Sequence, residues 1–126
     1  MIDVKTHIKY WIESASDDLE TAKILIKNKK YLHGLFFCHL TIEKSLKAAF
    51  VNYNRTIPPK SHNLFLLSEK SNIDFNEKDE IFLGVLMKYQ LEGRYPDYKP
   101  MIPDFKTISN YFEKTKEIFE WIRAKL

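Results

Sequence analysis

Glycine, proline and cysteine are scarce in this sequence of 126 residues, which has three glycines, five prolines and one cysteine. Because glycine and proline interrupt helices most strongly, their scarcity leaves room for long helical segments. The single cysteine, Cys38, excludes a disulfide within the chain, and nothing beside it indicates a reactive thiol. The glycines, Gly34, Gly84 and Gly93, are far apart, so no glycine-rich loop is available to hold a phosphate.

The sequence also lacks the run of about 20 apolar residues that a membrane-spanning helix needs. Its first residues, MIDVKTHIKYW, do not contain the apolar segment of a secretory signal. We therefore expect a soluble cytoplasmic protein that does not associate with a membrane.

No pattern typical of a metal site or a nucleophilic enzyme is present. The four histidines, His7, His33, His39 and His62, do not form the HExxH motif of zinc proteases. His39 and Glu43 are four residues apart and could supply two ligands, but no ExxH pattern supports a di-iron bundle. No serine lies in the sequence context of a nucleophile elbow. We expect neither a metal nor a cofactor.

The length and composition fit one compact domain, and we expect residues 1–126 to form a single helical domain. Hydrophobic residues make up 44% of the chain and include nine Phe, seven Tyr and two Trp, enough to fill a core. The net charge of +3 and the pI near 8.9 make the chain mildly basic. That charge is compatible with an anionic ligand or RNA but does not by itself indicate one.

Apolar residues recur at helical spacing in five segments. The expected helices cover residues 4–28, 31–53, 62–70, 77–92 and 104–125. We expect the first two to pair as a hairpin, because very short connections join antiparallel neighbours. The pattern predicts an all-α protein, an antiparallel up-and-down helix bundle of four long helices and one short helix, with no credible strand.

Individual residues set the details of these helices. Ser61 is a plausible N-cap for the short helix, which places His62 in its first turn, and Asn76 and Asp104 are good N-caps for the last two. In the first helix, Asp17 and Asp18 are expected on the face away from the apolar stripe. Gly34 is expected to permit close approach of a neighbouring helix, and Gly93 fits the position after the fourth helix.

Three polar residues interrupt the apolar stripe of the helix expected at 31–53. His39, Glu43 and Lys47 are four residues apart, so their side chains lie one helical turn above the next. A glutamate in an apolar face is costly to bury unless it is paired or hydrogen-bonded. Two interpretations stay open: a polar cluster that only fixes helix packing, or the lining of a ligand groove.

A second candidate is the segment after the fourth helix, where proline precludes a continuous helix. It contains Arg94, Tyr95, Asp97 and Tyr98. Arginine offers a planar fork for phosphate or carboxylate, and tyrosine can stack on a base. The alternative is an ordered turn in which Arg94 pairs with Asp97 and both tyrosines pack down. His62 has a similar ambiguity, between a group that faces a ligand and a surface or capping residue.

The order of several short motifs resembles that of a known family. The motifs are SDDLETA at 16–22, Tyr31 followed by a Phe-Phe pair, IEKSLKA at 42–48, His62-Asn63-Leu64 and Arg94-Tyr95-Pro96-Asp97. Together they resemble the HEPN domain over residues 4–123. The resemblance implies a dimeric helical bundle that is linked to nucleotide or RNA binding. It also implies a minimal nucleotidyltransferase as a partner encoded nearby, in some cases as a toxin–antitoxin pair.

The toxin branch of that family consists of metal-independent ribonucleases that use an arginine followed four to six residues later by a histidine, contributed by both subunits. This sequence departs from that motif, because no histidine follows Arg94 at the required distance. The expected general acid or base is therefore missing. Tyr98 is a poor replacement at neutral pH, since an unperturbed tyrosine titrates near pH ~10. The chain thus looks like a member of the non-nuclease branch, which binds ligands.

Three hypotheses follow. In the first, a non-catalytic protein binds a nucleotide or RNA. Its ligand-binding residues would be Arg94, Tyr95, Asp97, Tyr98, Glu43, Lys47, His39 and His62, with Glu43 accepting a hydrogen bond from Arg94. In the second, a divergent ribonuclease toxin uses Arg94 with His62 or Tyr98. In the third, the chain is an interaction module for a nucleotidyltransferase, with Tyr95 or Tyr98 as a surface group or nucleotidylation target.

Overall fold

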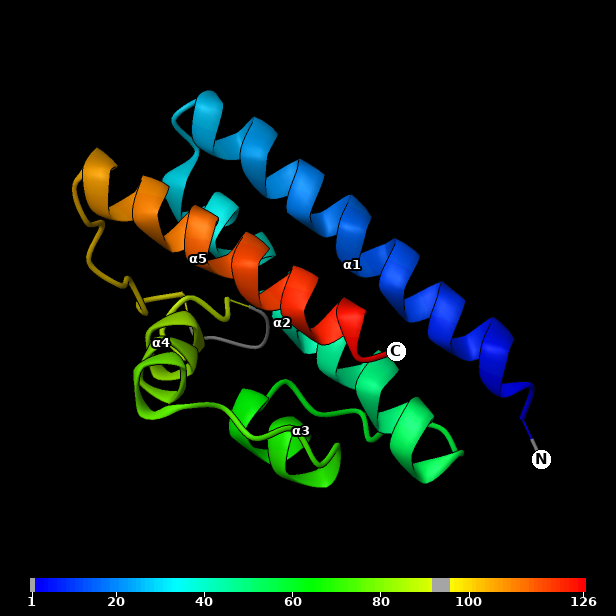
Figure 1. The fold of residues 1–126 in the computed structure, drawn as a ribbon. Coiled ribbons are helices and arrows are strands. Elements are labelled where there is room, and N and C mark those ends of the chain that lie inside the picture. The colour runs from blue at the N-terminus through cyan, green and yellow to red at the C-terminus, as the bar shows by residue number, and fades with distance from the viewer. Residues whose placement is uncertain (1, 92–95) are drawn as a thin grey trace.

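The computed structural model describes residues 2–91 and 96–126, and these form five helices and no strand (Figure 1). The helices are α1 (Val4–Lys27), α2 (Tyr31–Asn54), α3 (Leu64–Lys70), α4 (Glu77–Met87) and α5 (Phe105–Ala124). This confirms the all-α class. Within the described ranges, no helix has both the length and the apolar content that crossing a membrane would require.

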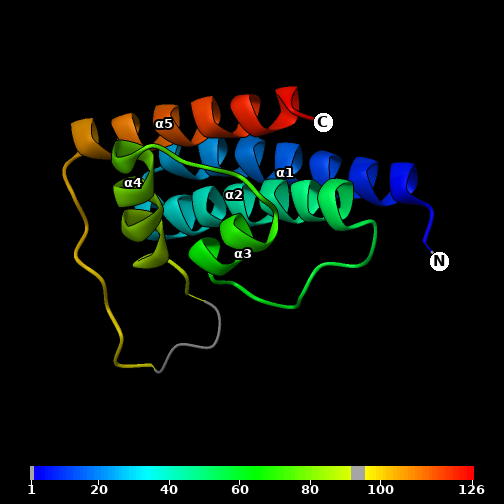
Figure 2. The ribbon, with the colours of Figure 1, turned by 60° about the horizontal axis from the view of Figure 1, so that its bottom comes forward.

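Helix α2 lies at the centre of the fold and contacts the other four helices. The long helices α1, α2 and α5 run alongside one another, and the short helices α3 and α4 cover another side of α2 (Figures 1 and 2). The core between them is built from aliphatic side chains that are fully buried, among them Leu35, Ile42, Leu46, Ile108 and Ile122. Because neighbours surround α2, most of its second half is buried.

Helices α1 and α2 form the expected hairpin, joined by three residues. Gly34 is buried at their close approach, and a Cβ atom added there would lie 2.6 Å from Cγ1 of Ile26. The structure therefore confirms that Gly34 permits the two helices to approach. At the other end of α1, the Asp3 side chain caps the helix by accepting a hydrogen bond from the Thr6 N–H.

The structure does not confirm the predicted arrangement of four long helices and one short helix, because α4 ends at Met87 rather than at residue 92. After Met87 the backbone tightens: the N–H of Tyr89 donates to the carbonyl of Leu86 at 2.9 Å, an i→i−3 bond. The buried Tyr89 then donates its hydroxyl to the carbonyl of Met101 at 3.3 Å. This contact anchors the connection that leads to α5.

The start of α3 also differs from the prediction. Asn63, not Ser61, is the N-cap, and its side-chain oxygen accepts from the N–H groups of Phe65 and Leu66. The helix therefore begins at Leu64, and His62 lies before it rather than in its first turn. This shift allows His62 to reach across to α2.

The caps of the last two helices match the prediction. The Asn76 side chain accepts from the Asp79 N–H, and the Asp104 side chain accepts from the Thr107 N–H, both at 2.8 Å. The hydrogen bonds from Thr107 favour the charged carboxylate and lower the pKa of Asp104. The position predicted for Gly93 lies outside the described residues.

Candidate functional site

Residues 55–63, here called the strap, connect α2 to α3 and pass along one side of α2. The strap begins at Arg55, which has the left-handed φ of 61° that ends α2 and turns the chain. Pro58 and Pro59 in the middle prevent it from forming a helix. The strap and the connection between α4 and α5 both extend from the same side of the bundle (Figure 2).

Four polar residues meet where the strap crosses α2. His39, Glu43 and Lys47 come from successive turns of α2, and His62 comes from the strap; we call these four residues the polar cluster. The Glu43 carboxylate is at its centre. It accepts from Nζ of Lys47 and from Nδ1 of His62, each at 3.0 Å. Glu43 is only 3% exposed, so these bonds satisfy the charge that the sequence placed in an apolar face.

His39 fixes the strap through a hydrogen bond to the strap backbone. Its ring is fully buried, and its Nε2 donates to the backbone carbonyl of His62 at 3.0 Å. A carbonyl can only accept, so this nitrogen carries a proton. Nδ1 of His39 lies 3.7 Å from the Glu43 carboxylate. His62 is therefore fixed twice, by its side chain to Glu43 and by its backbone to His39.

The exposure of the cluster differs sharply between its members. His39, Glu43 and Lys47 are buried, while the His62 side chain is 44% exposed. A carboxylate that accepts from Nδ1 of an imidazole fixes the orientation of the ring. The cluster thus presents one oriented imidazole at the surface, supported from behind by buried groups. Such a group can hydrogen-bond a ligand or transfer a proton.

Lys47 connects the cluster to α1. Its ammonium group lies 5.3 Å from the centre of the Trp11 ring, and the residue is 7% exposed. The cation–π contact and the bond to Glu43 together compensate its charge. Lys47 is therefore placed to stabilise the cluster rather than to reach a ligand in solvent.

A second ion pair, which sequence reasoning missed, joins α1 to α2. Asp18 was expected on the face away from the apolar stripe, but it is only 8% exposed and pairs with Lys44 at 2.7 Å. Lys44 also donates to Oγ of Ser14 at 2.8 Å. Desolvation by burial raises the pKa of Asp18, and Lys44 opposes that shift. This ion pair joins the motifs at 16–22 and 42–48. The expected pairing of the two helices that carry these motifs was the sequence signal that could have revealed the contact.

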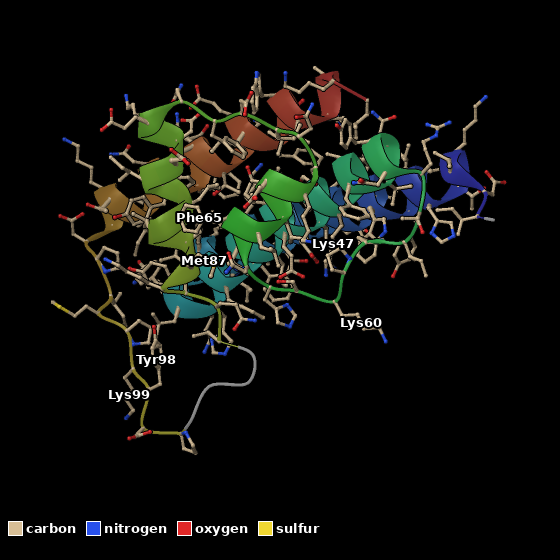
Figure 3. The ribbon with its side chains drawn as sticks, turned by 90° about the horizontal axis from the view of Figure 1, so that it is seen from below. Lys47, Lys60, Phe65, Met87, Tyr98 and Lys99 are labelled. Carbon is tan, nitrogen blue, oxygen red and sulfur yellow. The ribbon has the colours of Figure 1, made fainter. Side chains whose placement is uncertain are left out.

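The segment after α4 is only partly described. Arg94 and Tyr95 lie outside the described residues, so the expected contact of Arg94 with Glu43 and its alternative pairing with Asp97 stay predictions. Asp97 is exposed. Tyr98 donates its hydroxyl to the carbonyl of Lys88 at 2.6 Å, and it lies on the outer loop, away from Lys47 (Figure 3).

The end of α4 nevertheless lies beside the strap. The N–H of Leu64, two residues after His62, lies 3.4 Å from Sδ of Met87, the last residue of α4. The last residue of α4 therefore lies close to the end of the strap that carries His62. The structure thus brings together His39, Glu43, Lys47 and His62, and it places the end of α4 beside the strap.

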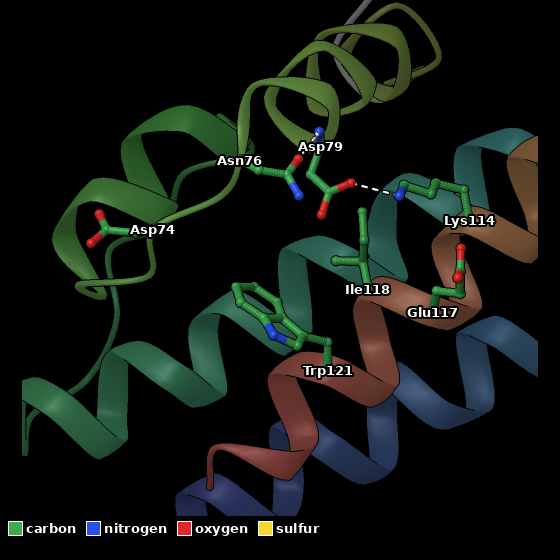
Figure 4. A pocket seen from close by; sticks show the side chains of 7 residues that line it. All are labelled: Asp74, Asn76, Asp79, Lys114, Glu117, Ile118 and Trp121. Atoms are coloured by element: carbon green, nitrogen blue, oxygen red, sulfur yellow. Dashed lines mark hydrogen bonds and ion pairs between the residues drawn. The ribbon is translucent and has the colours of Figure 1, made fainter.

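A separate pocket of about 390 Å³ lies between the start of α4 and α5 (Figure 4). Its wall contains an ion pair of 2.6 Å between Asp79 and Lys114, which ties α4 to α5. The Trp121 ring lies at one side, with the ammonium group of Lys125 4.4 Å from its centre. The ion pair and the cation–π contact engage three of the lining side chains, Asp79, Lys114 and Trp121.

Cys38 is fully buried, and its burial raises the pKa of the thiol to about 12. A thiol with that pKa is almost entirely protonated near neutral pH, which makes it a poor nucleophile and metal ligand. In residues 2–91 and 96–126, no group of three or more His, Cys, Asp or Glu side chains is placed to hold a metal ion.

Comparison with known proteins places the chain in a structural context. A family model described as the HEPN domain matches residues 8–125. The structure of TT1696 from Thermus thermophilus is similar, with a TM-score of 0.78, 22% identity, and coverage of 94% of this chain and 98% of that chain. So is ST0689, an archaeal HEPN homologue, with a TM-score of 0.64, 16% identity, and coverage of 94% and 96%. No curated protein matches the sequence.

Proposed function

Because the chain belongs to the HEPN domain family, we propose that it is a non-catalytic protein that binds a nucleotide or RNA at the surface beside the polar cluster. The observation that carries the proposal is the exposed His62 imidazole, oriented by the buried Glu43 carboxylate at 3.0 Å. Its partners in this proposal are a second copy of the chain and a nucleotidyltransferase-domain protein.

In this proposal the residues divide into two groups. His62 contacts the ligand from the strap, and Arg94, Asp97 and the tyrosines at 95 and 98 contact it from the segment after α4. An arginine fork suits a phosphate, and a tyrosine ring suits a base. The buried Glu43, Lys47 and His39 hold His62 in place, so they support the site without touching the ligand.

The test is a thermal-shift screen of the purified protein with nucleotides and short RNAs. A ligand that binds only the folded state raises the free energy of unfolding by about 2.7 kcal/mol at a concentration of roughly 100 times its Kd. We expect this stabilisation to disappear in Arg94→Ala and His62→Ala. It should persist in Lys99→Ala, which removes an exposed cation from the same connection. If no ligand shifts the transition, the interaction module for a nucleotidyltransferase becomes the better hypothesis.

The second candidate function is a metal-independent ribonuclease, favoured by one observation: the carboxylate–imidazole pair of Glu43 and His62. A carboxylate that accepts from Nδ1 is the usual way to orient a histidine that acts as a general base. RNA cleavage that survives a chelator, and that both Arg94→Ala and His62→Ala abolish, would establish this function. If the RNA in the thermal-shift samples stays intact, the protein binds RNA without cleaving it.

A further inference from the structure

Two grooves flank the N-terminal half of α1, outside the polar cluster. The first, here the basic groove, has a volume of about 480 Å³ and lies where α1 meets the C-terminal ends of α2 and α5. Its floor is apolar and includes Ile8 and Ile12. Its four cationic side chains are Lys5, Lys9, Arg55 and Arg123. No Asp or Glu side chain of the described residues lines it.

The cations of the basic groove are only weakly neutralised. Lys9 lies 3.8 Å from Glu13, with both side chains mostly exposed, and Arg123 pairs with the half-exposed Glu120. Exposed pairs of this kind contribute little and are screened by salt. Within residues 2–91 and 96–126, neither Lys5 nor Arg55 has a carboxylate at ion-pair distance. The groove therefore carries net positive charge.

The second groove, here the aromatic groove, has a volume of about 350 Å³ and lies between α1 and the strap. Its lining residues are Thr6, His7, Tyr10, Trp11 and Ile57. Tyr10 is 60% exposed and meets Trp11 edge to face, with ring centres 5.1 Å apart. Lys47 packs over the Trp11 ring from the polar cluster, so this ring is held in place.

The strap contributes residues to the basic groove, the aromatic groove and the polar cluster. Arg55 lines the basic groove, Ile57 lines the aromatic groove, and His62 belongs to the polar cluster. Between the last two, Lys60 extends into solvent (Figure 3). The first turns of α1 extend beyond the C-terminal end of α5 (Figures 1 and 2).

We propose that the basic and aromatic grooves bind single-stranded nucleic acid, with phosphates on Lys5 and Arg55 and a base stacked on Tyr10. A cationic groove next to an exposed aromatic ring is the recurrent chemistry of sites that bind single strands. A mononucleotide fills only one groove, whereas a polynucleotide spans both. The inference rests on the proposed function and adds to it the ligand class and a second binding surface.

The test measures binding of a fluorescently labelled oligouridylate of about 12 nucleotides by anisotropy, at several salt concentrations. The double variant Lys5→Glu, Arg55→Glu removes two phosphate contacts. We expect it to weaken binding at least tenfold and to reduce the slope of log K against log salt by about 1.4, at roughly 0.7 per contact. The matched control is Lys78→Glu, Lys106→Glu. It makes the same charge change at two exposed positions in the first turns of α4 and α5, where acidic side chains favour the helix.

Stacking is tested separately. Tyr10→Ala removes a mostly exposed ring. We expect it to raise the Kd about tenfold, because loss of one base-stacking contact weakens binding by roughly this factor. Phe105→Ala is the matched control: its ring is also 60% exposed, but it lies at the start of α5, beside the C-terminal half of α1. This control should bind like the unmodified protein.

The outcomes separate this inference from the proposed function. If both groove variants bind like their controls while His62→Ala and Arg94→Ala do not, the grooves are not the site, and the proposed function stands without them. If the unmodified protein binds neither oligouridylate nor nucleotides, both fail. Sedimentation gives a further check: if Lys5→Glu, Arg55→Glu alters the mass of the assembly, this face is an interface between copies and the inference is wrong.

Discussion

The carboxylate of Glu43 shows how one residue can determine a site. It is almost completely buried, and groups from α2 and the strap surround it. Burying an isolated carboxylate is very costly, so it requires the ammonium of Lys47 and the ring of His62 as partners. The same bonds orient His62 at the surface. Stability and the presentation of a functional group therefore depend on one side chain.

Replacing Glu43 with Ala should lower the free energy of unfolding by about 3–5 kcal/mol, because it leaves Lys47 buried without its counter-charge. Urea unfolding measures this loss. The matched control is Glu13→Ala, which breaks another i,i+4 pair with a lysine, but an exposed one at 3.8 Å; that change should cost less than about 0.5 kcal/mol. Equal costs for both variants would contradict the electrostatic account of the cluster.

The close packing of α1 against α2 depends on the absence of a side chain at Gly34. In most helix interiors, replacing Gly with Ala stabilises the helix by about 1 kcal/mol. At Gly34 the new Cβ would lie 2.6 Å from Ile26 Cγ1 and 3.4 Å from the Ile26 backbone nitrogen, so the Ile26 side chain or the helix backbone must shift. Because the helices share a large interface, a local displacement affects many contacts.

We therefore expect Gly34→Ala to destabilise the protein by about 1–2 kcal/mol, since the overpacking cost exceeds the gain in helix propensity. Thermal or urea unfolding tests this. Gly84→Ala is the control within α4, where a Cβ would lie 3.6 Å from Phe65 Cζ, an ordinary contact. That variant should be neutral or more stable than the parent. A stable Gly34→Ala would show that the two helices do not pack as closely as described.

At the scale of the whole molecule, the strap and the connection to α5 extend from the same side of the bundle (Figure 2), and the strap contributes His62 to the polar cluster. That connection also exposes two large apolar side chains: Met101 and Ile102 are 88% and 56% exposed. Exposed apolar clusters commonly mark interfaces between proteins. They are consistent with the homodimer that the family resemblance implies.

Sedimentation equilibrium should therefore give a mass close to twice the 15.0 kDa of one chain at micromolar concentration. Burial of these apolar side chains against a second copy supplies the physical reason. The mass should be insensitive to moderate salt, because apolar burial is not screened as exposed ion pairs are. A mass of one chain over the whole concentration range would contradict the expected dimer.

The sequence by itself determined the helical class and much of the register. Apolar spacing located the long helices α1, α2 and α5, and the side chains of Asn76 and Asp104 located two helix starts, because these signals act within a few residues. The i,i+4 spacing of His39, Glu43 and Lys47 likewise required their side chains to lie on one face, wherever the helix packed.

Only the tertiary structure decided how these pieces meet. The end of α4 at Met87 and the burial of Asp18 depend on neighbours that are distant in the sequence. His62 joins Glu43 because the strap crosses α2, and no local pattern specifies that crossing. The two grooves beside α1 were missed for the same reason, since their walls come from separate elements. Local propensity depends on nearby residues, whereas a binding surface depends on which distant residues the packed core brings together.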